Sequence, residues 1–383
     1  MVIGPRAQWL RRVLLLAVAG GALAAVLGGL GRLGFDMPGA EWAMDHGPLF
    51  VLGVFQTVVG LERAVALGKP WGYGAPILGG IGAIGMVASF TLAPWLSVGA
   101  GGWLVLVNCA IVHRQTAAFT WLMLLGSVVL WGGSLTWALG RPVFEVVSSW
   151  LAFFVLTIIA ERLELSRLAP TPPWAPRLLI VLALLYAAAS VSACLAIPLA
   201  PQVMGALLVA LACWQLRFDL ARRTLRRSGL PRFAALGVLL GTSWLLVAGT
   251  LLAFHGLPRA GPFYDAILHA VFVGFVLSMV FAHAPIILPA VARIDLPFHT
   301  SLYVPLIALH GGLIARVLGD VLEAVEVRRI GGLANALSLA LFAGTAFVAR
   351  HFGSVRSETA RSVTSSPETA ERPQRMGSGP GAH

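Results

Sequence analysis

The chain consists largely of long apolar stretches that follow one another with few interruptions. About twelve of them are long and apolar enough to cross a bilayer as an α-helix, which needs about 20 residues. Only 11% of the residues are charged, against about a quarter in soluble domains. The sequence therefore predicts an all-α, polytopic membrane helix bundle. The expected spans are residues 13–31, 47–67, 73–90, 96–112, 117–139, 143–160, 178–199, 202–216, 233–254, 266–282, 301–318 and 331–349.

Short polar and proline-containing segments separate the spans and set the expected domain limits. Glycine and proline breakers occur at 68–70, 140–142, 170–173 and 229–231. The first apolar run is longer than the core of a signal peptide, so we expect an uncleaved span. We predict a short amino-terminal segment (residues 1–12), one transmembrane domain (13–350) and a tail (351–383). The tail is rich in Ser, Thr, Pro, Gly and Arg, a composition typical of disorder.

Arginine predicts the orientation in the membrane. The net charge is +11, yet Lys69 is the one lysine. If the amino terminus is cytoplasmic, most arginines face the cytoplasm, including the cluster at 217–232, as the positive-inside rule requires. We therefore expect a multi-pass protein of the cytoplasmic membrane with both termini inside. Such basic loops contact anionic lipid head groups, so the charge does not indicate nucleic acid. Six arginines fall on the outer side: Arg32, Arg141, Arg259, Arg316, Arg328 and Arg329.

Several functional classes have no support in the sequence. It contains no phosphate-binding loop, no dinucleotide-binding unit, no H-E-x-x-H and no G-x-S-x-G motif. Cys109, Cys194 and Cys213 lie in apolar runs without paired spacing, which argues against disulfides, a zinc site and a c-type haem attachment. The functional classes that remain are a transporter, a channel, a redox or gas-binding protein, and a sensor or assembly factor.

Histidines inside the spans are the strongest candidates for chemistry, because ionisable groups are costly in a bilayer. His46 opens the second span, and His269 lies about one turn inside the tenth. His310 lies near the middle of the eleventh span. His283 follows His269 by 14 residues, about 21 Å along a regular helix and on nearly the same face. Imidazole is a common ligand of haem iron and of copper.

Asp265 precedes His269 by four residues, on the same helix face. It could orient the imidazole as an acceptor behind a ligating ring. It could instead cap a helix that begins at Ala266. Gly53 and Gly274 could lie against a flat macrocycle or allow two helices to pack closely. The residues leave both pairs of alternatives open.

The tenth span resembles a known family. Leu268-His269, Val273-Gly274 and Met279 reproduce the L-H-x-x-x-V-G-x-x-x-x-M pattern of NnrS proteins. The histidine-led second span, from His46, is similar to the H-E-M-L-x-G-F segment of that family. Where NnrS chains have an earlier histidine, this chain has Met44, and Gly47 and Pro48 replace the Glu and Met.

The resemblance implies a bacterial membrane protein of about twelve spans that contains haem and copper and is linked to nitric oxide. If the resemblance holds for these residues, His46 and His269 would bind a b-type haem near the outer face. His310 and His283 are added from their position in the spans, as further haem or copper ligands. The implied role is a response to nitrosative stress or the handling of haem and metal, with a small gas as ligand and a respiratory-chain partner. The alternative is a proton-coupled secondary transporter, whose tenth span would be broken near Pro285 and Pro289.

Overall fold

A computed structural model describes residues 5–169 and 171–364, and it confirms the all-α fold. No strand occurs in these residues. The helices that form the bundle are α1 (Pro5–Arg32), α2 (His46–Pro48), α3 (Gln56–Leu67), α4 (Gly74–Val87), α5 (Ala93–Arg114), α6 (Ala118–Ala138), α7 (Val143–Ser166), α8 (Trp174–Cys194), α9 (Ala200–Phe218), α11 (Leu230–His255), α12 (Pro262–His269), α13 (Ser278–Ala292), α14 (Tyr303–Val321) and α15 (Val325–Thr364). Short 3₁₀ turns and α10 (Ala221–Thr224) connect some of them.

Two π-helical segments interrupt this pattern. η2 (Leu49–Phe55) joins α2 to α3, and η4 (Ala270–Leu277) joins α12 to α13. The tenth span is thereby one continuous helix, Pro262–Ala292, of 31 residues. It passes through Pro285 and Pro289 without breaking, so the break suggested by these prolines is absent.

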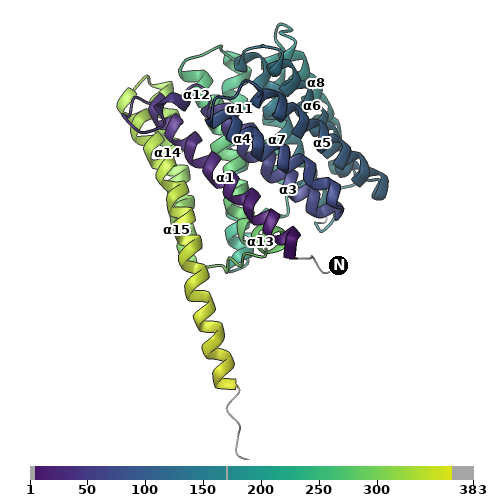
Figure 1. Ribbon diagram of the computed structural model, residues 1–383. Helices are drawn as coiled ribbons and strands as arrows, with labels where there is room; N and C mark the ends of the chain where they lie inside the picture. Colours follow the sequence, from purple (N-terminus) through teal and green to yellow (C-terminus); the bar gives the residue numbers. More distant parts are fainter. Residues whose placement is uncertain (1–4, 170, 365–383) are drawn as a thin grey trace, which may run out of the picture.

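Eleven helical segments in the described residues are long and apolar enough to cross a membrane. The expected third span, α4, has only 14 residues, about 21 Å of helix. The first turn of α1 and the lower part of α15 nevertheless lie at the same end of the bundle (Figure 1). An even number of crossings fits that arrangement, so we predict that α4 crosses as the twelfth. We call this end the amino-terminal end; its cytoplasmic location remains a prediction.

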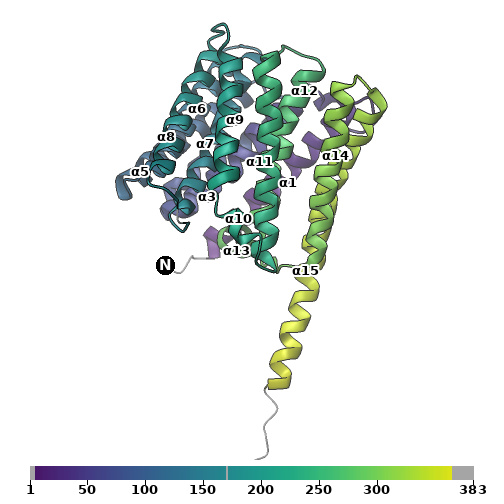
Figure 2. The same cartoon turned by 180° about the vertical axis from the view of Figure 1, so that it is seen from behind.

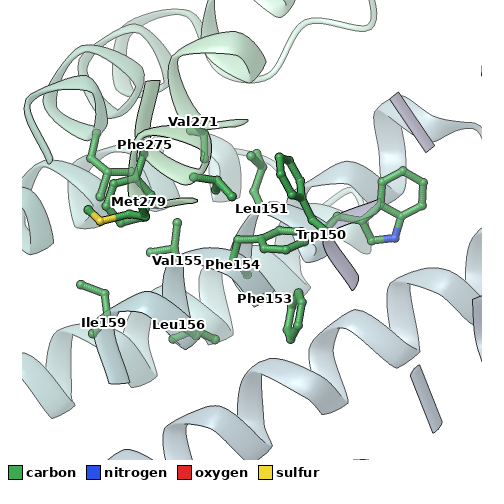
Figure 3. Packing of buried hydrophobic residues seen from close by; sticks show 14 of the residues in the cluster. Trp150, Leu151, Phe153, Phe154, Val155, Leu156, Ile159, Val271, Phe275 and Met279 are labelled. Carbon is green, nitrogen blue, oxygen red and sulfur yellow. The ribbon is translucent and has the colours of Figure 1, made fainter. Parts of the chain in front are cut away.

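The centre of the bundle is α7. In its most apolar stretch 83% of the residues are buried, against 22% for α15 at the edge. A helix that is apolar on all sides suits a position surrounded by other helices. Figure 3 shows Phe154 and Val155 of α7 packed towards Val271 and Phe275 of η4. This core holds η4 firmly against the centre of the molecule.

At its carboxyl end, α15 extends beyond the expected span. The helix continues to Thr364, into residues that the composition assigns to the tail. Residues 365–383 lie outside the described residues, and the expectation of disorder there stays a prediction.

Candidate functional site

A cavity of about 420 Å³ lies at the end of the bundle opposite the amino-terminal end. Its volume is within the range of small-molecule and cofactor sites. The wall comes from α1, η2, the start of α7, α12 with η4, and the first part of α15. Most of the lining is apolar, including Val26, Phe50, Val147, Phe272 and Leu339. Figure 2 shows α12, which carries part of this wall, at the end away from α10 and α13.

His46 lines the cavity from the first residue of α2. Its Nδ1 is 2.8 Å from the carbonyl oxygen of Ala43, to which it donates a hydrogen bond. Nε2 has no hydrogen-bond partner among the described residues. The ring lies beside Gly29 of α1, where a Cβ would come within 3.7 Å of it. His46 is thus oriented by its Nδ1, and its Nε2 has no partner in the described chain that would compete with a ligand.

His269 lines the same cavity from the last residue of α12. Its Nδ1 donates to the backbone carbonyl of Asp265 at 2.8 Å, and the Asp265 carboxylate lies at 3.3 Å. Nε2 again has no hydrogen-bond partner in the described part of the chain. The structure therefore brings two imidazoles to one cavity. In each of them Nδ1 is hydrogen-bonded to a backbone carbonyl and Nε2 has no partner among the residues that the structure describes.

The carboxylate of Asp265 forms a bidentate ion pair with Arg316 of α14. Arg316 Nε is 3.0 Å from Oδ2, and Nη2 is 3.2 Å from Oδ1. Asp265 does not cap its helix, because α12 begins earlier and its N-cap is Gly261. It lies in the first turn, where the helix dipole favours a negative charge. Asp265 therefore supports His269 through its backbone and anchors α12 to α14 through its side chain.

Each cavity histidine lies within three residues of the start of a π-helical segment. η2 begins three residues after His46, and η4 begins one residue after His269. Phe50 and Phe272 of these segments face the cavity. π-Helical turns are rare and concentrate at functional sites. The two segments meet at the cavity from spans that are far apart in the sequence.

Gly53 and Gly274 serve helix packing. A Cβ at residue 274 would overlap the indole of Trp244, and one at residue 53 would press on Ala83. Leu268 and Val273 of the NnrS-like pattern line the cavity, whereas Met279 is buried in the hydrophobic core. Of the alternatives left open for the glycines, the geometry favours close contact between helices.

His310 lies away from the cavity and uses both ring nitrogens. Trp244 Nε1 donates to its Nδ1 at 2.9 Å, and Ser278 Oγ is 3.2 Å from its Nε2. Ser278 Oγ donates to the carbonyl of Gly237, so His310 carries its proton on Nε2. This network ties α11, α13 and α14 together. His310 contributes to packing and has no nitrogen free to ligate.

His283 lies at the amino-terminal end of the bundle. Its Nδ1 is 2.9 Å from the carbonyl of Met279, and Arg162 Nη2 is 3.1 Å from Nε2. Arg162 also lies 4.0 Å from Asp219. Burial raises the pKa of the Asp219 carboxyl, while Arg162 and the hydrogen bond from the Ala221 backbone lower it. The π-helical segment between His269 and His283 changes the helical phase, so the shared face expected for a regular helix does not hold.

No group of three or more His, Cys, Asp or Glu residues is placed to hold a metal ion in residues 5–169 and 171–364. His46 and His269 share the cavity, and His310 and His283 lie elsewhere. Sequence reasoning missed the charged residues around the cavity: Arg32, Arg259 and Arg316. Their presence on the outer side, which the positive-inside rule disfavours, is the signal that could have found them.

The fold and the cavity define the class of this protein: a multi-pass helical membrane protein with a ligand-sized cavity near one membrane face. The chain belongs to the family described as "Domain of unknown function (DUF8744)", which matches residues 11–351. No curated protein matches the sequence. The family match does not assign the chain to NnrS, so its function has to be argued from the site.

Proposed function

We propose that this membrane protein binds a b-type haem in the cavity, with His46 and His269 as the protein ligands of the iron. The observation that carries the proposal is the matched state of the two imidazoles, each with Nδ1 on a backbone carbonyl and Nε2 unpaired in the same cavity. Histidines that ligate a metal usually have the other ring nitrogen fixed in this way.

The donor set favours haem over an isolated copper ion. A porphyrin supplies four of the iron's ligands itself, so the protein needs to give no more than two. Copper centres of the His₂Cys type use three side chains, and no group of three such residues is placed to hold a metal in the described residues. The mainly apolar walls suit the faces of a macrocycle.

By its resemblance to NnrS, we place this activity in the handling of nitric oxide or of haem at the outer face of the cytoplasmic membrane. With both imidazoles bound, the haem iron would have no open position, so nitric oxide would bind by displacing one of the two histidines. On the protein side, His46 and His269 would fix the porphyrin between α2 and α12, and the surrounding apolar side chains would limit the access of water.

The test is spectroscopic. The protein is purified in detergent after expression with added haem precursor, and its iron content and reduced-minus-oxidised spectrum are measured. We expect a Soret band and about one iron per chain, and loss of the low-spin spectrum in His46→Ala and His269→Ala. His255→Ala is the matched control, because His255 lies near the same membrane face, stacked on Phe263 outside the cavity. Folded wild-type protein without iron or a Soret band would exclude the proposal.

A further inference from the structure

The six arginines of the predicted outer side differ in how their charges are neutralised. Four have a carboxylate partner. The pairs are Arg141 with Glu145 at 2.6 Å, Arg316 with Asp265 at 3.0 Å, Arg328 with Asp320 at 3.7 Å and Arg329 with Glu326 at 3.1 Å. Arg32 and Arg259 form no ion pair with any of the described residues.

Both unpaired arginines line the cavity. Arg32 ends α1, and its one side-chain hydrogen bond among the described residues is a long contact of 3.9 Å to the sulfur of Met44. Arg259 lies over the ring of Phe144, 5.5 Å from its centroid. Neither contact neutralises a charge. The two guanidinium groups come from separate segments, the end of α1 and the loop after α11.

The cavity therefore has an excess of positive charge beside its apolar walls. Asp265 is the one carboxylate among its lining residues, and Arg316 already pairs with it. Arg32 and Arg259 therefore contribute two positive charges that no carboxylate of the lining neutralises. A ligand that fits has an apolar body and two acidic groups.

We propose that Arg32 and Arg259 bind the two carboxylates of a porphyrin ligand, and so select the dicarboxylic acid over neutral forms of the same macrocycle. This inference rests on the proposed haem function. The guanidinium fork matches a carboxylate in geometry as well as in charge. Because both arginines are exposed at the rim, their effect weakens as salt screens the charges.

The test compares acids with esters of one macrocycle. Purified apoprotein is titrated with haemin, with metal-free protoporphyrin IX and with the dimethyl ester of each, and Kd is followed by tryptophan quenching and Soret absorbance. We expect the wild-type protein to bind each acid roughly a hundredfold more tightly than its ester, the combined effect of two charge-assisted contacts of about tenfold each. Arg32→Gln and Arg259→Gln should each weaken the acids roughly tenfold and leave the esters unchanged. Arg329→Gln, which removes an arginine already paired with Glu326, should change neither.

The outcomes of this titration distinguish the proposed carboxylate site from the proposed haem ligation. If the acids and esters bind equally, or the two variants bind the acids as the wild type does, the carboxylate site is wrong; a Soret spectrum that still depends on His46 and His269 would then leave the haem function standing. If metal-free protoporphyrin binds in an arginine-dependent way but haemin shows no dependence on the histidines, the carboxylate site stands and the haem ligation is wrong. If no porphyrin binds folded protein, both are wrong.

Discussion

At the scale of single residues, the embedded histidines differ in the hydrogen-bond partners of their two ring nitrogens. His46 and His269 each use one nitrogen and leave the other to the cavity. His310 and His283 have protein groups within hydrogen-bond distance of both. Position in a span suggested all four as ligands, because sequence reveals that a histidine is embedded and does not reveal its partners. The sequence could supply the position of each histidine within its span, with His46 at the start of the second and His269 about one turn inside the tenth.

His310→Ala tests this distinction. Removal of the imidazole leaves the buried Nε1–H of Trp244 without an acceptor and opens a void among α11, α13 and α14. We expect a loss of about 2–3 kcal/mol in unfolding free energy, measured as a lower Tm in detergent. The haem spectrum per folded molecule should not change.

The control is His255→Ala, which should lower stability by no more than about 0.5 kcal/mol because the side chain is exposed. A His310→Ala protein of normal Tm that has lost its Soret band would instead make His310 a ligand. It would also require the Trp244 contact to be broken in the loaded protein.

At the scale of elements, the sequence could not predict the two π-helical segments, η2 and η4. Hydropathy located the spans well: the expected eighth span, 202–216, is α9, Ala200–Phe218. Hydropathy reports length and apolar content, whereas the i→i+5 hydrogen bonding of η2 and η4 depends on how neighbouring helices pack. For η4 that packing includes the indole of Trp244 against Gly274.

Gly274→Ala tests whether η4 holds His269 in place. The added methyl group would overlap the Trp244 ring, so α11 and η4 have to separate. Overpacking of this kind costs about 1–3 kcal/mol. We expect a lower Tm and weaker porphyrin binding, because η4 begins directly after His269.

Gly311→Ala of α14 is the matched control. A Cβ at residue 311 meets no atom within 4 Å, so its Tm and porphyrin Kd should stay at the wild-type values. Wild-type behaviour of Gly274→Ala would show that the contact between α11 and η4 does not determine the geometry of the cavity.

At the scale of the whole molecule, the orientation of the cavity depends on α4. Eleven long helices alone would put the start of α1 and the end of α15 on opposite sides of the membrane. The structure has them at one end (Figure 1), so we predict that the 14-residue α4 crosses as well, despite being shorter than the bilayer core. Each helix after α4, including α12 with His269, takes its direction from this crossing.

Reporter fusions test the crossing and the orientation together. We expect a carboxy-terminal fluorescent fusion to be active in the cytoplasm, and an alkaline phosphatase fusion after Arg259 to be active outside, because the cavity faces outwards if the arginine-rich loops face inwards. A fusion within the 222–227 loop should report the cytoplasm and serves as the control on the opposite end. If α4 does not cross, reporters after it invert, the carboxy terminus lies outside and Arg259 inside. Arg32 and His46 precede α4 and would stay on the original side, opposite Arg259 and His269, so the cavity that these four residues line could not form and the proposed haem site would be wrong.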